Sequence, residues 1–344
     1  MHKASLILNF TIKLYLCIKY ETLNLADYKS EFLDFLNKKI QIKEPKNLYE
    51  PIHYILGIGG KRLRPMLTLV SAHFFKGDYK KAFHAALAIE VFHNFTLVHD
   101  DIMDEAPIRR GKTTVHKKWD LNRGILSGDA MMLMTNQLME HYESKKFKDL
   151  MVLFNKTALE VCEGQQYDVD FETRNDVSID EYKTMITYKT AVLVACSLKM
   201  GAIIADVEKQ DAEFIYNYGL NLGIAFQLQD DYLDTFGDPE TFGKQIGGDI
   251  LENKKTFLYL KLLEVINDDD KKSLLKWFST DEKSDKKIKE VTVLYTKYNI
   301  PTIVKLEIDK YTQLSYKSLQ NTTMNNEGKQ FFTQLGDDLL HRTV

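Results

Sequence analysis

The distribution of proline constrains the fold more than any other feature of the sequence. The chain has six prolines in 344 residues, and none lies between Pro107 and Pro239. Because proline breaks the interior of a helix, long helices are allowed across this span. Apolar residues such as Leu87, Val91 and Phe95 recur four residues apart, which is the spacing of one helical face. The pattern predicts an all-α protein.

The sequence gives no sign of a second fold or of a repeat. Few segments alternate with a period of two, and no Asn-Gly or Asp-Gly pair marks a hairpin. No Pro/Gly/Ser-rich linker divides the chain. We therefore expect a poorly packed extension at residues 1–20, followed by one domain at residues 21–344. Residues 267–290 carry charges of mixed sign and are expected to form a solvated surface segment, with Asp268–Asp270 as solvated charge or helix capping.

Charge and cysteine content exclude several classes of protein. The formal charge of −3 gives no reason to expect a nucleic acid partner. Three widely separated cysteines indicate neither a disulfide framework nor a zinc site, which favours a cytoplasmic protein. The first twenty residues are apolar, but Lys13 and Lys19 interrupt a run that is too short to span a bilayer. We therefore expect no stable membrane insertion.

Residues 97–112, LVHDDIMDEAPIRRGK, place an acidic cluster directly before a basic one. Asp100 and Asp104 are four residues apart and share one face of a helix, whereas Asp101 points elsewhere and can support them. Taken alone, such a cluster is also typical of a solvated helix end.

A second copy of the acidic pattern changes this interpretation. Residues 227–234, QLQDDYLD, carry Asp230, Asp231 and Asp234 at the same spacing, again after an apolar helical run. Mg²⁺ takes one or two carboxylates and completes its shell with water and substrate phosphates. Two clusters therefore predict a diphosphate held by several Mg²⁺ ions. Neither cluster has the alternating ligands, the glycine or the terminal glutamate of an EF-hand.

Residues 57–65, GIGGKRLRP, supply a candidate anion site. Glycines let a backbone approach an anion closely, and arginine can bind phosphate through two nitrogens. The segment is not a P-loop, because Ile55 stands where the first glycine is required and Arg62 replaces the Ser/Thr. A charged turn before a helix remains an alternative for this segment alone.

The motifs together are far more specific than any one of them. GGKRLRP, HDDIMDEAPIRRGK, YKT at 188–190 and FQLQDDYLD with GKQIGGD occur in this order. The combination resembles the trans-type isoprenyl diphosphate synthases, or polyprenyl synthetases, over roughly residues 50 to 260. The resemblance implies a bundle of long helices around a deep central cavity, and a homodimer. It also implies the head-to-tail condensation of isopentenyl diphosphate with an allylic diphosphate, with about three Mg²⁺ ions per active site.

The same resemblance assigns roles to individual residues. The metal site would comprise Asp100, Asp101, Asp104, Asp230, Asp231 and Asp234. The allylic diphosphate would be bound by Arg109, Lys189, Lys244 and Lys254, and isopentenyl diphosphate by Lys61, Arg64, His93 and Arg110. Lys189, Thr190 and Gln227 would act at the breaking C–O bond. In the segment GQQYDVDFE, Gln165, Gln166 and Asp170 could reach the cavity or pack as buried polar groups.

Residues just before the first DDxxD line the cavity floor in this family. Phe95 and Thr96 lie five and four residues before Asp100, so they are the candidates for setting product length. A single aromatic there is typical of short-chain synthases, with geranylgeranyl favoured over farnesyl diphosphate as product; ordinary core packing is the alternative for Phe95. Two other functions stay open: a class I terpene cyclase, and a non-catalytic subunit of a heteromeric prenyl synthase.

Overall fold

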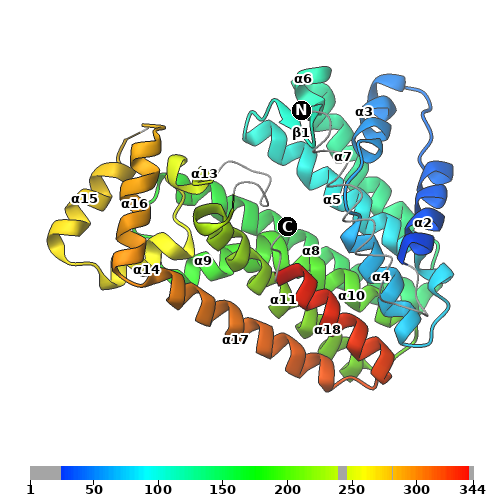
Figure 1. The fold of residues 1–344 in the computed structure, drawn as a ribbon. Helices are drawn as coiled ribbons and strands as arrows, with labels where there is room; N and C mark the ends of the chain where they lie inside the picture. The colour runs from blue at the N-terminus through cyan, green and yellow to red at the C-terminus, as the bar shows by residue number, and fades with distance from the viewer. Residues whose placement is uncertain (1–24, 239–245, 281, 341–344) are drawn as a thin grey trace. The chain divides into compact units, whose positions relative to one another are not determined.

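The computed structural model describes residues 25–238, 246–280 and 282–340. These residues are almost entirely helical, as Figure 1 shows, so the prediction of an all-α protein is confirmed. The predicted extension at residues 1–20 and the predicted ligand Lys244 lie outside the described residues. The described chain divides into two compact units, and the single domain expected from the sequence stays a prediction.

Unit 1 contains the described residues up to Met151 together with Met200–Asp206. The central pair in this unit is α5 against α7, and α4 and α3 also pack on them. Its elements are α2 (Leu25–Lys39), α3 (Lys46–Gly57), α4 (Leu63–Phe74), η1 (Tyr79–Ala82), α5 (Phe83–Met103), β1 (Ile108–Arg109), β2 (Lys112–Thr113), α6 (Val115–Lys118), α7 (Leu121–Met139) and the start of α8 (Ser144–Thr173).

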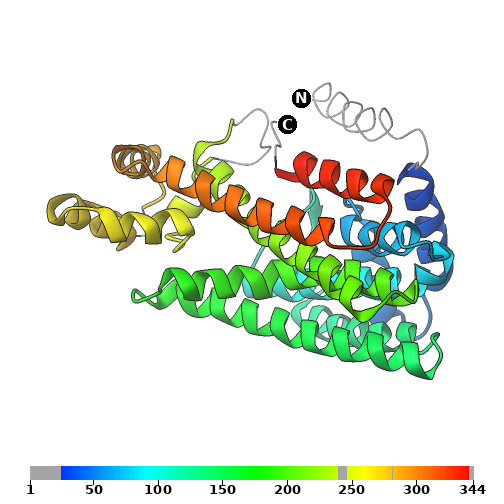
Figure 2. The same cartoon turned by 90° about the horizontal axis from the view of Figure 1, so that it is seen from below.

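Unit 2 contains residues Val152–Lys199 and Val207–Val344, of which the last four are not described. Figures 1 and 2 both show α17 alongside α11, and α11 also contacts η2 and α18. After α8 the elements are α9 (Ile179–Ile186), η2 (Thr187–Ala191), α10 (Val192–Ile204), α11 (Lys209–Phe236), α13 (Gly248–Leu251), α14 (Phe257–Val265), α15 (Asp268–Phe278), α16 (Asp285–Lys297), α17 (Ile300–Gln320) and α18 (Asn326–Leu340).

Helix starts follow from local sequence. Asp120 caps α7 by accepting from the backbone of Arg123, and Ser178 forms a capping box with Glu181 at the start of α9. Such caps satisfy backbone N–H groups that have no partner inside the helix. Asn267 caps α15, and Asp268–Asp270 fill its first turn, so the cap is the residue before the predicted cluster and the three aspartates lie at the positive end of the helix dipole.

Two details differ from the sequence analysis. A short hairpin pairs β1 with β2, and its two loop residues, Arg110 and Gly111, both have positive φ. This is the geometry that fits the twist of two short strands, and an Arg-Gly pair was not among the expected turn signals. The solvated segment predicted at 267–290 is wrong at Lys287, which is completely buried.

One continuous helical stretch, Ile179–Ile204, is long and apolar enough to cross a membrane by length and composition alone. Most of its apolar window is buried inside the structure. A core helix of a globular protein has the same properties, so this stretch is weak support for a membrane span.

Candidate active site

The first aspartate cluster lies at the end of α5. The backbone turns directly after it, with Glu105 in a left-handed conformation and the Ala106 amide donating to the Asp101 carbonyl at 2.9 Å. This turn leads into the hairpin that carries Arg109. The Nε atom of Arg109 contacts Oδ1 of Asp101 at 2.8 Å. Asp101 is buried, and its Oδ2 has no hydrogen-bond partner among the described residues.

The hairpin also places Arg110 on the glycine turn before α4. The Arg110 guanidinium donates to the Gly59 carbonyl. A Cβ atom on Gly60 would lie 2.6 Å from Nη1 of Arg110, at a φ of +127°. Glycine is favoured there because other residues rarely adopt this backbone angle, and an added Cβ would also require the guanidinium to shift. The glycine pair therefore allows this close approach.

A set of basic side chains surrounds His93 on α5. Nη1 of Arg64 lies 3.3 Å from Nε2 of His93. Burial, and then the neighbouring arginines, lower the pKa of His93 well below its ordinary value. Burial lowers the pKa of Arg64 to about 10, although Glu90 opposes the shift. The Nε atom of Arg64 is buried without a partner among the described residues.

The arginine inside GGKRLRP has a different position from its neighbours. Arg62 is buried and forms an ion pair with Glu90 of α5, and it also donates to the Leu56 carbonyl. Lys61, by contrast, is exposed. Arg62 therefore fixes the turn that carries Lys61 and Arg64.

The two candidate chain-length residues also lie on α5. The ring of Phe95 packs on Phe92 at 5.6 Å and against the edge of His99 at 4.8 Å, between ring centroids. Thr96 donates its hydroxyl to the His93 carbonyl at 2.8 Å. Phe95 is only partly buried, so it is not an ordinary fully buried core residue.

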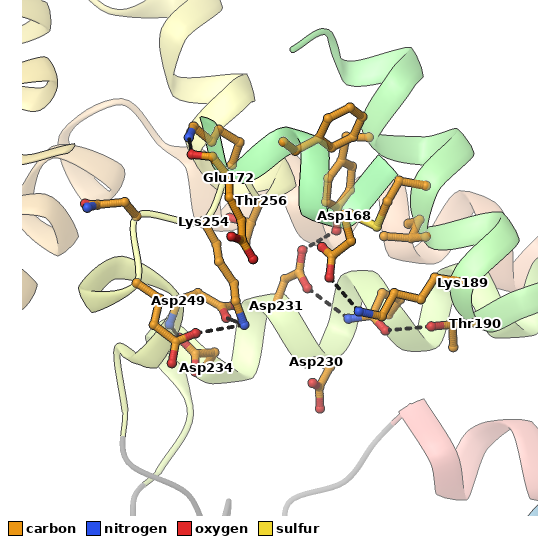
Figure 3. Close-up of a pocket in the computed structure, with 18 residues that line it drawn as sticks. Asp168, Glu172, Lys189, Thr190, Asp230, Asp231, Asp234, Asp249, Lys254 and Thr256 are labelled. Carbon is orange, nitrogen blue, oxygen red and sulfur yellow. Dashed lines mark hydrogen bonds and ion pairs between the residues drawn. The ribbon is translucent and has the colours of Figure 1, made fainter. Parts of the chain in front are cut away.

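The second cluster lines a pocket of about 230 Å³ in unit 2. Figure 3 shows Asp230, Asp231 and Asp234 along one helix, α11, with the ammonium of Lys189 joined to Asp168. The remaining walls come from the end of α8, from α9 and from residues 249–256.

Lys189 and Thr190 belong to η2, a π-helical insertion between α9 and α10. Insertions of this kind are frequent at functional sites. Gly164 of α8 allows η2 to approach, because a Cβ atom there would lie 2.3 Å from the Lys189 nitrogen. The Lys189 ammonium pairs with Asp168, and the Thr190 hydroxyl donates to Oε1 of Gln227 at 3.3 Å. The three predicted catalytic residues therefore come together.

Asp231 is a buried carboxyl of the second cluster with two hydrogen-bond donors. It accepts from the Tyr182 hydroxyl and from Nε2 of Gln227 at 3.2 Å. Burial, and then repulsion from Asp249, raise its pKa to about 8 despite these two hydrogen bonds.

The loop after the second cluster brings in Asp249 and Lys254. Oδ2 of Asp234 accepts from the Asp249 backbone at 3.0 Å. The Lys254 ammonium lies 3.3 Å from Oδ1 of Asp249 and 3.0 Å from Oε2 of Glu252. Burial opposes its charge, but the two carboxylates raise its pKa overall. Of the predicted allylic diphosphate ligands in this unit, Lys189 and Lys254 both face the pocket.

The carboxylate oxygens of the two aspartate clusters suit a hard cation such as Mg²⁺, which also takes oxygen ligands from a substrate. Within residues 25–238, 246–280 and 282–340, no group of three His, Cys, Asp or Glu side chains is arranged to hold a metal ion by itself. Mg²⁺ commonly uses one or two carboxylates and substrate phosphates for the rest of its shell. The partnerless Oδ2 of Asp101 and the crowded carboxylates around Asp231 are suited to this mode of binding.

Several residues at the site were not found from the sequence. In the segment GQQYDVDFE, the pocket residues are Asp168, Phe171 and Glu172, whereas Gln166 and Asp170 are exposed and hydrogen-bonded to each other at 2.7 Å. Asp168 lies one helical turn after Gly164, so the glycine could have indicated the inward face. No local signal marks Tyr182 or Glu90, because their partners are distant in sequence.

Comparison with known proteins identifies the family. Residues 45–295 match the model of the polyprenyl synthetase family. The chain is 38% identical to a geranylgeranyl diphosphate synthase of Sulfolobus acidocaldarius over 297 residues, covering 83% of this chain and 89% of the relative. It is 32% identical to a geranylfarnesyl diphosphate synthase of Natronomonas pharaonis, covering 93% and 97%.

A solved structure agrees with this result. The crystal structure of a geranylgeranyl pyrophosphate synthase has 52% sequence identity and a TM-score of 0.89, covering 93% of this chain and 99% of that one. The chain belongs to the polyprenyl synthetase family. The prediction of a head-to-tail prenyltransferase is thereby confirmed.

Proposed function

We propose that this chain condenses isopentenyl diphosphate with an allylic diphosphate to give geranylgeranyl diphosphate, with about three Mg²⁺ ions at the active site. The observation that carries the proposal is the grouping of Lys189, Thr190, Gln227 and Asp231 around one acidic pocket. The relatives named for geranylgeranyl diphosphate support this product.

The reaction needs a leaving group that can accept negative charge. In the proposed site Arg109, Lys189, Lys244 and Lys254 bind the allylic diphosphate, and the six cluster aspartates hold the metal. Mg²⁺ supplies charge neutralisation at the diphosphate as the C–O bond breaks. Basic side chains fixed in advance contribute most where charge develops, and Lys189 and Lys254 are held by Asp168 and Asp249.

Breaking the C–O bond leaves an allylic carbocation. Oxygen dipoles can stabilise this cation, provided that they do not attack it and form a covalent bond. Gln227 donates its Nε2 to Asp231 and accepts from Thr190 through Oε1. Asp231 therefore fixes which end of the amide faces Thr190. We propose that the two oxygens stabilise the cation, while the second substrate is bound by Lys61, Arg64, His93 and Arg110. The double bond of isopentenyl diphosphate then attacks the allylic cation to form the new C–C bond, and the released pyrophosphate takes up the proton that the product loses.

The first test is chain extension with isopentenyl diphosphate, each allylic primer and Mg²⁺. Asp100→Ala and Asp230→Ala should each lower the rate by about a thousandfold, since a metal contributes several kcal/mol to the barrier. Asp269→Ala is the matched control, because Asp269 lies in the exposed Asp268–Asp270 run with a 93% exposed side chain. Extension that survives both cluster variants would refute the metal assignment, and a cyclic hydrocarbon product would indicate the cyclase alternative.

Product length is proposed to depend on Phe95, with Thr96 beside it. Phe95→Ala should lengthen the product seen by chromatography of radiolabelled chains, because removal of the ring opens space for further units. Phe92→Ala provides a comparison, since Phe92 is fully buried next to Phe95. An unchanged product from Phe95→Ala would refute this role.

The protein is further proposed to be a cytoplasmic homodimer without a nucleic acid partner. Along α7, Leu121, Ile125, Leu126 and Leu133 expose between 40% and 64% of their surface. Apolar side chains gathered on one helix are suited to a partner subunit. Light scattering coupled to gel filtration should give twice the chain mass, and Leu133→Glu should lower it.

A further inference from the structure

Lys287 is a completely buried lysine that lies outside the pocket. It stands in the first turn of α16, where its backbone amide donates to the Ser284 cap. A buried ammonium is costly unless it is well paired, and the positive end of the helix dipole adds to that cost. A lysine in such a place needs a compensating set of contacts.

Lys287 contacts the turn that carries Lys254. Its ammonium donates to Oδ1 of Asn253 at 2.6 Å and to the Thr280 carbonyl at 3.3 Å. Nδ2 of Asn253 donates to the same Thr280 carbonyl at 3.1 Å. Hydrogen bonds thus link Lys287, Asn253 and the Thr280 carbonyl to one another, and we call this set the Lys287 clamp.

Asn253 is well placed to pass this restraint to the pocket. Its backbone is left-handed, with φ of 57°, and its neighbour Lys254 donates its amide to the Asp249 carbonyl at 2.9 Å. The Lys254 ammonium returns to the Asp249 carboxylate. The clamp therefore holds the turn whose two charged side chains face the second aspartate cluster.

The other end of the loop is also held by α16. A Cβ atom on Gly247 would lie 2.7 Å from Cγ2 of Ile288, the residue after Lys287. The amide of Gly247 donates to the Asp234 carbonyl at 2.6 Å. The loop is thus fixed between the second cluster on one side and the first turn of α16 on the other.

We propose that Lys287 is a positioning residue, which sets the place of Lys254 and Asp249 for the allylic diphosphate through Asn253. The inference rests on the proposed function, because the ligand of Lys254 is the diphosphate proposed above. Lys287 contacts no substrate in this scheme. Its loss should weaken allylic diphosphate binding and leave isopentenyl diphosphate binding unchanged.

The test compares Lys287→Met with Lys289→Met, a lysine on the same helix that is exposed. Lys287→Met should raise the KM for the allylic substrate about tenfold, the usual effect of losing a supporting hydrogen bond behind a ligand. The KM for isopentenyl diphosphate should stay within about twofold of wild type, and Lys289→Met should leave both constants unchanged. An allylic KM at the wild-type value in Lys287→Met would overturn the proposal.

A second variant covers the case in which Lys287→Met does not fold. Asn253→Gly removes the amide side chain, and glycine accepts the left-handed backbone without strain. It should show the same selective rise, and in the double variant the two effects should not add, because they break one set of contacts. A wild-type allylic KM in Asn253→Gly would equally overturn the proposal.

Failure of the proposed function has a different signature. A wild-type protein that forms no prenyl diphosphate would refute that function and leave the clamp testable. The affinity for inorganic pyrophosphate in the presence of Mg²⁺, measured by calorimetry, should still be about tenfold lower in Lys287→Met than in wild type and Lys289→Met. Equal binding by all three proteins would refute the clamp.

Discussion

Asp101 in the first aspartate cluster and Asp231 in the second hold the same place in the DDxxD pattern, and both are buried. Asp101 pairs with a cation, Arg109, which follows eight residues later. Asp231 is held by two neutral groups, Tyr182 and Gln227, and is repelled by a further carboxylate, Asp249. The pattern thus fixes which helical face carries the acids, whereas compensation of their charge comes from other parts of the chain.

The two aspartate clusters also differ in the charged residues around them. Around the first cluster, unit 1 contains a second buried ion pair, Arg62 with Glu90. Around the second cluster, unit 2 concentrates carboxylates, so that the pKa values of Asp231 and Asp249 are both raised. We infer that unit 1 is stabilised by its own charge pairs, and that the second cluster depends more on bound metal.

The largest expected effect is on the buried ion pair. Glu90→Ala should lower the free energy of unfolding by about 3–5 kcal/mol, because it leaves Arg62 buried without its partner. Asn94, which donates to Oε1 of Glu90 at 2.9 Å, also loses a contact. Denaturant unfolding measures the change. Glu31→Ala is the control, since Glu31 forms a surface pair with Lys80 and should cost under about 1 kcal/mol; equal losses would contradict the importance of the buried pair.

The sharpest contrast is between Asp101→Asn and Asp231→Asn in metal-free protein. Asp101→Asn should destabilise by about 2 kcal/mol, through loss of a charged hydrogen bond. Asp231→Asn should stabilise by about 1 kcal/mol at neutral pH, because folding then no longer requires the buried carboxyl to take up a proton. Thermal unfolding without Mg²⁺ measures both changes.

The second variant also has a definite pH dependence. The pKa of Asp231 is 3.8 in the unfolded chain and about 8 in the folded protein. Between these two pH values the free energy of unfolding of the wild-type protein falls as pH rises, because the unfolded chain has released the proton that the folded protein still binds. The advantage of Asp231→Asn should therefore grow with pH over this range. Changes of the same sign in both variants would show that the two clusters do not differ as inferred.

The sequence indicated those parts of the molecule that depend on local spacing. Proline placement and apolar periodicity predicted the helices, and the spacing of the aspartates predicted which of them share a face. The turn signals missed the hairpin because Arg110-Gly111 provides its positive φ angles instead of Asn-Gly or Asp-Gly.

Partners that are far apart in sequence could not be predicted. Tyr182 precedes Asp231 by 49 residues, and Lys287 follows Asn253 by 34. Helical periodicity places a residue on a face but does not say which other helix that face meets. Lys287 was expected to be solvated because its neighbours in sequence are charged, whereas its burial depends on a contact between α16 and the loop after α11.

Tyr182 can be used to test whether the hydrogen bond behind Asp231 affects the Mg²⁺ requirement of the second cluster. Tyr182→Phe keeps the buried ring and removes the hydroxyl that donates to Asp231. The Mg²⁺ concentration for half-maximal activity should rise about tenfold, as is usual when a partner behind a metal site is lost. Tyr218→Phe is the control, because Tyr218 is a similarly buried tyrosine of the same unit that lies outside the pocket and donates its hydroxyl to the Phe332 carbonyl. An unchanged Mg²⁺ requirement would leave Tyr182 with a packing role only.

The smallest expected effect concerns His93 beside the first cluster. Burial and the surrounding arginines lower the pKa of His93 well below its ordinary 6.5. The unfolded chain therefore binds more protons below that pH, so the stability contributed by the neutral ring is lost as pH falls below about 6.5. Between about pH 7.5 and about pH 5 the free energy of unfolding should fall by about 1 kcal/mol less in His93→Gln than in wild type. His53→Gln, at an exposed position of α3, should keep the wild-type slope, and the same slope in His93→Gln would show that acid sensitivity arises elsewhere.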